Sequence, residues 1–330
     1  MRIVLLVTSP RLPAGLLSAQ AWDVVRAHPV FAVAESAQAA ALRAAGAAVT
    51  LLPAPTADQL LAAAAPTGVA VWLAGPAGDP DLAREVGLRL ARAPGTAELE
   101  LMYGSWDPPG ARLLDAVAVM DHLVSPGGDP WKRAQTHQTL ARFLLEEAYE
   151  AYDAIEAGDL AALREELGDL LLQVVLHARL AEELPEDDRW SVDEVAGGLV
   201  DKMIRRNPHV FAGTAVADLD EITDNWEQIK RAEKARGSVL DGVAAAQPAL
   251  ALAAKVLARV DRAGLDVPLP AEGSGEPAGA GERGGLLGAQ LLAVVASARA
   301  AGLDAEAELR RAVLAYISAV RAAEQSESAV

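Results

Sequence analysis

Residues Phe143–Leu171 read FLLEEAYEAYDAIEAGDLAALREELGDLL, two leucine-rich helical stretches separated by Gly158 and Asp159. Glycine is favoured just after the end of a helix, and aspartate just before the start of the next one. We therefore predict that the two stretches fold back on each other as an antiparallel helical hairpin. The second helix, expected over about 160–183, is apolar round nearly its whole circumference, which predicts that it is buried.

Acidic residues occupy positions on both helices where the apolar periodicity favours hydrophobic side chains. Counted from Gly158, Glu150 and Glu166 each lie eight residues away, on opposite helices. Glu147 and Asp169 each lie eleven residues away. At a rise of about 1.5 Å per residue the members of each pair lie level, and the i,i+3 spacing places both acids of a helix on one face. The pattern predicts that four carboxylates converge.

Four carboxylates in a largely apolar bundle would repel one another and lose solvation unless a cation compensates them. All-oxygen ligation favours Mg²⁺ or Mn²⁺, calcium fits on grounds of charge, and zinc is disfavoured because His and Cys ligands are missing. The alternative for a Glu-rich helix is a solvated acidic face. Glu146, Glu156 and Glu165 fit that description, although Glu146, next to Glu147, could also be an outer-shell ligand of the metal or help to position a water molecule.

The acidic pattern resembles the signature of the all-α nucleoside triphosphate pyrophosphohydrolases: EEAYE at 146–150, then Glu166 and Asp169 after a spacer of fifteen residues. The flanking segments narrow the resemblance to the MazG family over about residues 113–243. These segments are DPWKRAQTHQTL (129–140), EELGDLLLQVVLHARLAEE (165–183), KMIRRNPHVF (202–211) and WEQIKRAEK (226–234). Members commonly read CPWD where this chain has 129–132, and His where it has Asn207.

The resemblance implies Mg²⁺-dependent hydrolysis of a (deoxy)nucleoside triphosphate to the monophosphate and pyrophosphate, and a role in nucleotide-pool housecleaning. Glu147, Glu150, Glu166 and Asp169 would bind the metal, and Glu146 would assist catalysis. A triphosphate carries about four negative charges, so cations must lie near an acidic metal site. Matching family positions contact nucleotide, and in this chain they hold Lys202, Arg206, Trp226 and Lys230, with Arg205 and Lys234 as neighbours.

Composition limits the class of protein. The chain has 330 residues, 52% of them hydrophobic, and this length predicts two or three folded units. It has no cysteine, so disulfides are excluded. The apolar run after Met1 is too short for a signal peptide or membrane span, and we interpret it as a first strand. A net charge of −17 without a basic tract argues against binding to DNA or RNA. We expect a soluble cytoplasmic protein.

Residues 1–112 alternate short apolar runs with Ala-rich helical ones, which predicts an α/β domain with a mostly parallel sheet. No Gly-rich turn follows the first run, so dinucleotide and P-loop fingerprints are missing. The stretches 70–83 and 109–123 resemble the tetrapyrrole-methylase-like domain fused ahead of some MazG modules. We interpret this part as a degenerate scaffold. Strands are expected at 2–7, 30–34, 49–52, 69–73 and 99–103.

The C-terminal part, residues 244–330, contains a segment similar in sequence to the second helix of the hairpin. Residues 287–299 match 167–179 at eight of thirteen positions, with an offset of 120. Leu286 and Ala289 stand where the metal site has Glu166 and Asp169. We predict a degenerate second MazG-like repeat that serves packing or self-association, preceded by a flexible linker over 268–285.

Because a two-helix hairpin cannot cover itself, we expect a four-helix arrangement completed by a second subunit, and so a homodimer or higher homo-oligomer. Two other classes of protein share some of these features. A ferritin-like di-iron protein needs Glu-x-x-His pairs, but neither Glu147 nor Glu166 has His three positions later. A non-catalytic nucleotide-binding regulator would use the same site without turnover.

Overall fold

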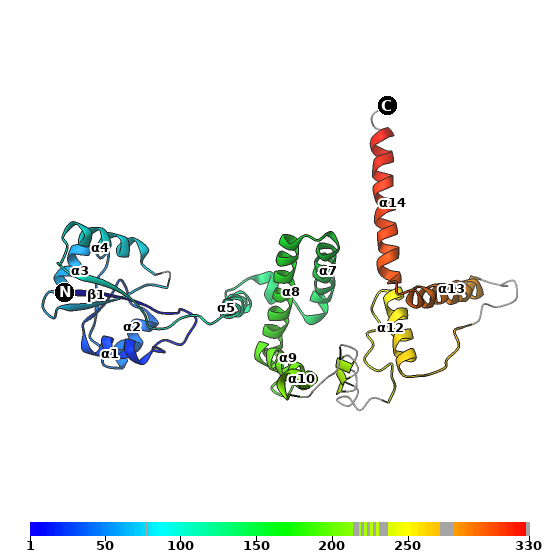
Figure 1. Cartoon of the computed structure of the whole chain (residues 1–330), viewed down its shortest axis with the longest axis horizontal. Helices are drawn as coiled ribbons and strands as arrows, with labels where there is room; N and C mark the ends of the chain where they lie inside the picture. The colour runs from blue at the N-terminus through cyan, green and yellow to red at the C-terminus, as the bar shows by residue number, and fades with distance from the viewer. Residues whose placement is uncertain are drawn as a thin grey trace. The chain divides into compact units, whose positions relative to one another are not determined.

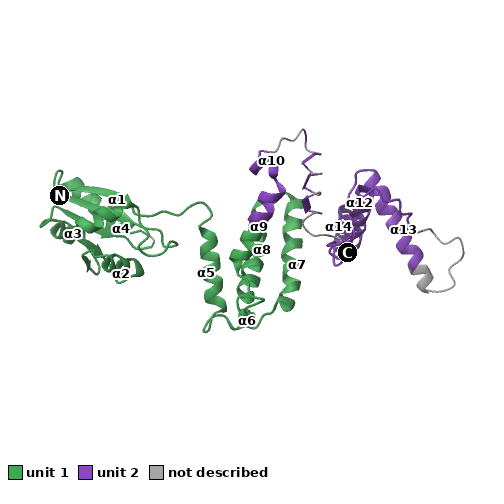
Figure 2. Cartoon of the chain, turned by 90° about the horizontal axis from the view of Figure 1, so that it is seen from below, with its two compact units in different colours: residues 1–199 green, residues 200–330 purple. Residues whose placement is uncertain are grey.

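The protein is described by a computed structural model, in which two compact units comprise residues 1–199 and 200–330 (Figure 2). The three domains expected from the sequence stay a prediction. The structure describes residues 1–76, 78–213, 218, 221–222, 225–226, 229–230, 237–270 and 280–327.

A parallel sheet forms the N-terminal part of the first unit (Figure 1). Within the described residues its five strands follow the order β3-β2-β4-β1-β5, and each pair of neighbours is parallel. The predicted α/β class with a parallel sheet is confirmed. The strands are β1 (Arg2–Val7), β2 (Val30–Ala32), β3 (Val49–Leu51), β4 (Val69–Leu73) and β5 (Glu98–Tyr103).

Helices cover both faces of this sheet because alternate residues of each strand point to opposite sides. Val4 and Leu6 of β1 pack with α1 (Ala19–Ala27) and α2 (Ala37–Ala44). Ile3 and Leu5 pack with α3 (Ala57–Ala64) and α4 (Pro80–Arg92). The similarity of this part to tetrapyrrole methylases stays a prediction.

Helices form the rest of the first unit. They are α5 (Arg112–Val124), α6 (Pro130–Arg133), α7 (His137–Ala157), α8 (Leu160–Ala181) and α9 (Val192–Arg206), of which α9 runs into the second unit. Their core joins α5, α7 and α8 through Met120, Val124, Leu140, Val175 and Leu176. This core fixes the C-terminal half of α8, and leaves the end near Gly158 to be held by the hairpin itself.

The predicted hairpin is confirmed. Gly158 ends α7 in the left-handed conformation, with φ of 67°. The Asp159 carboxylate then accepts hydrogen bonds from the backbone N–H groups of Ala161 and Ala162, both at 3.0 Å, and starts α8. A side chain at position 158 would be strained in this conformation, so glycine is the residue that allows the tight reversal.

The expectation that α8 is buried round nearly its whole circumference is wrong for the N-terminal half of the helix in the single chain. Its buried residues lie in the C-terminal half, between Gln173 and Ala181, while Leu160 and Leu167 in the N-terminal half are 78% and 53% exposed. On α7, Leu144 and Leu145 are also exposed. Helical periodicity identifies apolar positions, but it does not say whether the same chain covers them.

The second unit contains α10 (Pro208–Phe211), α12 (Ala249–Arg262), α13 (Ala280–Ala300) and α14 (Ala305–Glu327). Arg299 of α13 donates hydrogen bonds to the Ala254 carbonyl at 3.2 Å and to the Asp261 carboxylate at 2.7 Å, both on α12. Because α13 begins at Ala280, the last residues of the segment expected to be a linker are helical, while 271–279 lie outside the described residues. A degenerate repeat stays a prediction.

Candidate functional site

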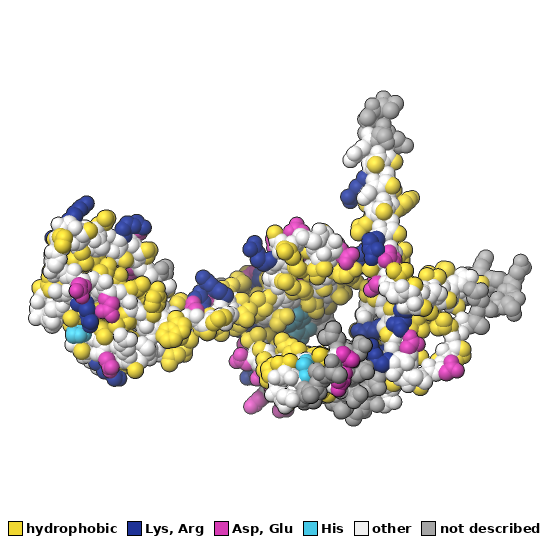
Figure 3. Space-filling model, viewed as in Figure 1, with side chains coloured by type: hydrophobic (Ala, Val, Ile, Leu, Met, Phe, Trp, Pro, Cys, Tyr) yellow, Lys and Arg dark blue, Asp and Glu magenta, His cyan; other side chains and the backbone are white. Residues whose placement is uncertain are grey.

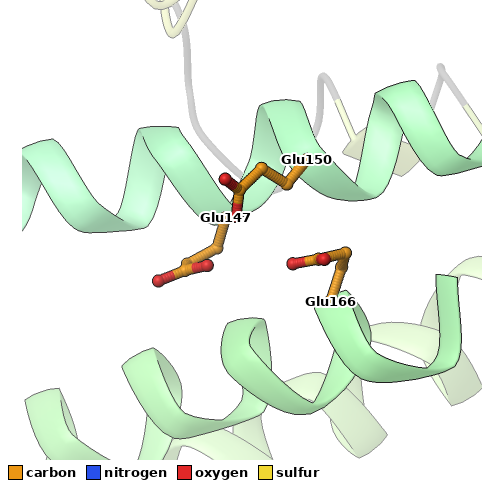
Figure 4. A group of neighbouring side chains, drawn as sticks. All are labelled: Glu147, Glu150 and Glu166. Atoms are coloured by element: carbon orange, nitrogen blue, oxygen red, sulfur yellow. The ribbon is translucent and has the colours of Figure 1, made fainter. Parts of the chain in front are cut away.

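Three carboxylates converge between the two helices of the hairpin (Figure 4). Glu147 and Glu150 extend from α7, and Glu166 extends from α8 towards them. One oxygen of each lies within 4.8 Å of the others, so a single ion could contact all three. Level positions across the hairpin, set by Gly158, bring these side chains together as the residue spacing predicts.

Two of these carboxyl groups have raised pKa values. The pKa of Glu147 is raised first by burial, and then by the charges of Asp169 and Glu150. The pKa of Glu166 is likewise raised first by burial and then by the charge of Glu150. Neighbouring carboxylates thus add to the effect of burial on both groups, and a bound cation would relieve the repulsion.

Asp169 stands slightly apart from the other three. It is half-buried on α8, and its charge acts on both Glu147 and Glu166, but it does not belong to the group of three whose oxygens all lie within 4.8 Å. Glu146 is exposed beside Glu147 and adds to the repulsion there. The structure thus brings three of the four expected ligands together directly, and the roles of Asp169 and Glu146 stay predictions.

The cluster lies closer to solvent than the sequence indicates. Glu147 and Glu166 are half-buried, whereas Glu150 is exposed. The expectation of four acids enclosed in an apolar bundle is therefore corrected for the single chain, because no helix of this chain covers the neighbouring apolar residues Leu144 and Leu167 within the part of the chain that is described.

A hard divalent ion fits this donor set. All donors are carboxylate oxygens from one rigid hairpin, which is the ligand type that Mg²⁺, Mn²⁺ and Ca²⁺ prefer. Burial, and after it the charges of neighbouring carboxylates, raise the pKa of Glu147 and Glu166, and a divalent cation would offset both effects. Glu147, Glu150 and Glu166 would hold the ion.

The predicted nucleotide contacts belong to the second unit. Lys202 and Arg206 are half-buried one turn apart on α9, with Arg205 exposed beside them. The Arg206 guanidinium carbon lies 5.5 Å from the centre of the Trp226 ring. Lys230 is half-buried and helical, one turn after Trp226, while Lys234 lies outside the described residues. The structure thus pairs a cation with an aromatic ring, an arrangement suited to a base and a phosphate.

A histidine pair was not predicted as a contact. His137 at the start of α7 and His177 of α8 lie with their Nδ1 atoms 2.7 Å apart, and the Trp190 ring lies 6.2 Å from His137. Burial lowers the pKa of His177, and the charge of His137 lowers it further. Counting from Gly158 could have found this pair, because the two residues lie 21 and 19 positions away.

The two departures from the family pattern have structural roles. Asp129 starts α6 by accepting a hydrogen bond from the Trp131 backbone N–H at 2.9 Å, and Trp131 meets the Phe143 ring edge-on at 5.8 Å. The Asn207 side-chain amide donates to the Met203 carbonyl at 2.7 Å, at the end of α9. Neither residue takes part in the carboxylate cluster.

Comparison with known proteins gives a consistent match. A family model described as the MazG nucleotide pyrophosphohydrolase domain matches residues 135–211. Over 244 residues the chain is 45% identical to the "Uncharacterized 26.1 kDa protein in blaB 3′ region" of Streptomyces cacaoi, which covers 74% of this chain and 94% of that protein.

Several curated relatives carry a functional name. The chain is 48% identical over 224 residues to the nucleoside triphosphate pyrophosphohydrolase of Mycolicibacterium smegmatis, and 45% identical over 217 residues to that of Mycobacterium tuberculosis. These matches cover 67% and 66% of this chain. They span 62% and 59% of the two relatives' own lengths.

Proposed function

The chain belongs to the MazG family, and from this premise we propose that it hydrolyses nucleoside triphosphates to nucleoside monophosphate and pyrophosphate in a Mg²⁺-dependent reaction. The observation that carries the proposal is the convergence of Glu147, Glu150 and Glu166 within 4.8 Å on the hairpin that the family model matches. The names of the Mycolicibacterium and Mycobacterium relatives support the reaction.

The acidic residues define where the reaction takes place. Glu147, Glu150 and Glu166 hold the divalent ion, with Asp169 close enough to share its charge. When bound, such an ion neutralises charge on the phosphates and makes a water molecule more acidic. Glu146, exposed beside Glu147, would accept a hydrogen bond from the attacking water and orient it.

The basic and aromatic residues of the second unit recognise the substrate. Lys202, Arg205, Arg206 and Lys230 supply positive charge for a polyphosphate, which a cluster of carboxylates alone would repel. Trp226, already in contact with Arg206, offers its ring to the base. This division separates affinity for phosphates from affinity for the base, and it suits a housecleaning enzyme that accepts more than one nucleotide.

A second subunit would complete the site. Leu144, Leu145 and Leu167 are 40%, 55% and 53% exposed on the helices that carry the carboxylates. Apolar side chains exposed at this density favour a helical partner, because water does not solvate them well. A homodimer in which two hairpins form a four-helix arrangement would bury these residues and enclose the acids.

Incubation of the full chain with Mg²⁺ and each NTP and dNTP, followed by anion-exchange separation of the products, tests the proposal. We expect monophosphate and pyrophosphate in equal amounts, and none after chelation of the metal. Diphosphate and orthophosphate as products would contradict it. Stoichiometric nucleotide binding without any turnover would identify a non-catalytic nucleotide-binding regulator instead.

A further inference from the structure

The C-terminal helix α14 leaves most of its surface uncovered. Its first turn, 305–308, is half-buried in the second unit, near α12 and α13. Every residue from 311 to 325 is exposed, and α14 extends beyond the helices at its base (Figures 1 and 3). A helix with so many exposed residues gains little from burial within the described part of its own chain.

The exposed residues of α14 follow the spacing of a helical seam. Leu309, Val313, Tyr316, Val320 and Ala323 are separated alternately by four and three residues. The first four are 54%, 48%, 72% and 39% exposed. Apolar residues at a 4-3 spacing repeat every 3.5 residues on average and bring one stripe of a helix against the same stripe of another. We name this stripe the α14 seam.

We propose that the α14 seam binds the α14 seam of a second copy of this chain, with the two helices antiparallel. One edge of the seam consists of the residues that directly follow Leu309, Tyr316 and Ala323 in the sequence. These are Arg310, Ile317 and Glu324, spaced seven apart. In an antiparallel pair these positions flank the seam and face their counterparts on the other helix. Ile317 then lies opposite Ile317 of the second copy, and Arg310 lies opposite Glu324 twice, by two-fold symmetry.

The same alignment matches side-chain sizes across the seam. Val313 faces Ala323 of the second copy, and Tyr316 faces Val320, so in these two pairs the larger residue meets a smaller one. The other flank carries Ala312 and Ala319, whose small side chains allow the helices to approach. In a parallel pair that alanine flank would face the Arg310 and Glu324 flank, and no pair of opposite charges would form.

Charges within α14 favour this occupant over a lipid surface. The helix contains four acidic and three basic residues, whereas helices that lie on membranes have a polar face rich in Lys and Arg. Among the described residues no single helix is long and apolar enough to span a membrane. The helical segments 285–300 and 305–325 reach the necessary length and apolar composition only when they are taken together, and they are bent by 105° relative to each other. Within its own helix, Arg310 lies 3.9 Å from Glu306.

Cysteine cross-linking of the full chain tests this arrangement, because the protein has no cysteine of its own. Ile317→Cys places a thiol at the two-fold axis of the antiparallel pair. Ser318→Cys, one residue on, places it on the far side of the helix and serves as the matched control. With a short bismaleimide, we expect the first variant to form a covalent dimer on a denaturing gel at least about tenfold faster than the second.

Charge exchange in the Ile317→Cys background distinguishes this pairing from others. Arg310→Glu and Glu324→Arg should each lower the yield of covalent dimer, and the double variant should restore it. Equal cross-linking at positions 317 and 318, no cross-linking at either, or a double variant worse than both single ones would overturn the proposal. Co-sedimentation of the wild type with phosphatidylcholine–phosphatidylglycerol vesicles that is lost in Val313→Glu would also overturn it, in favour of a lipid surface.

Discussion

Replacing Glu166 by glutamine should remove both hydrolysis and the stabilisation that Mg²⁺ gives to the folded protein. Glu166 is the member of the cluster supplied by α8, and its oxygen lies within 4.8 Å of the Glu147 and Glu150 oxygens. One ion therefore depends on all three. Losing a ligand should cost several kcal/mol of transition-state stabilisation, so turnover should fall at least about a hundredfold.

The accompanying stability change separates a lost metal site from a damaged fold. At a Mg²⁺ concentration about a hundredfold above its Kd, binding should stabilise the wild type by about 2.7 kcal/mol, or about 5 to 10 °C in Tm. Glu166→Gln should lose this shift. Because the pKa of Glu166 is raised in the folded state, its negative charge destabilises the metal-free protein at neutral pH, and the variant should melt slightly higher than the wild type without metal.

Glu156→Gln is the matched control, because Glu156 is an exposed acid of α7 outside the cluster. This variant should keep the turnover and the Mg²⁺-induced shift of the wild type. The reasoning is refuted if Glu166→Gln retains more than about a tenth of wild-type turnover, or keeps the full Mg²⁺-induced shift. Glu147→Gln and Glu150→Gln should behave like Glu166→Gln, and so should Asp169→Asn if it completes the site.

Three further predictions concern other parts of the chain. Lys202→Ala and Lys230→Ala should weaken binding of a non-hydrolysable triphosphate much more than binding of the monophosphate, whereas Trp226→Ala should weaken both; equal losses in calorimetric titrations of all three variants would contradict this division of roles. Because the pKa of His177 is lowered in the folded state, the unfolding free energy should fall as pH drops below the ordinary histidine value of about 6.5, and His177→Gln should flatten this slope in denaturant titrations; an unchanged slope would refute it. A truncated chain of residues 113–330 should still release pyrophosphate from nucleoside triphosphates. Stoichiometric binding of S-adenosylmethionine by residues 1–112 would refute the interpretation of this part as a degenerate scaffold.

The hairpin and the sheet could be predicted because local sequence determines them. Gly158 ends one helix and Asp159 starts the next, and both act through backbone and side-chain contacts within a few positions. Counting away from them places Glu147, Glu150 and Glu166 together. The strands of the N-terminal part were likewise marked by short apolar runs, of which β2 proved two residues shorter than expected.

What covers a side chain could not be predicted in the same way. Leu167 and Glu150 fall on the apolar stripe by periodicity, yet both are exposed in the single chain. Periodicity places a residue on a helix face, but it does not specify what packs against that face. The contact between His137 and His177 joins residues 40 positions apart. This contact could be predicted only after the two helices had been assigned as an antiparallel hairpin, because only then can positions on one helix be matched to positions on the other.

We propose that the carboxylate cluster of the α7–α8 hairpin binds the divalent ion needed for hydrolysis. Titration of the full chain with Mn²⁺, followed by electron paramagnetic resonance of the free ion, measures this directly. We predict saturable binding of one or two ions per chain that Mg²⁺ displaces, that is lost in Glu166→Gln, and that is kept in Glu156→Gln. Equal Mn²⁺ binding by the wild type and Glu166→Gln would contradict the account.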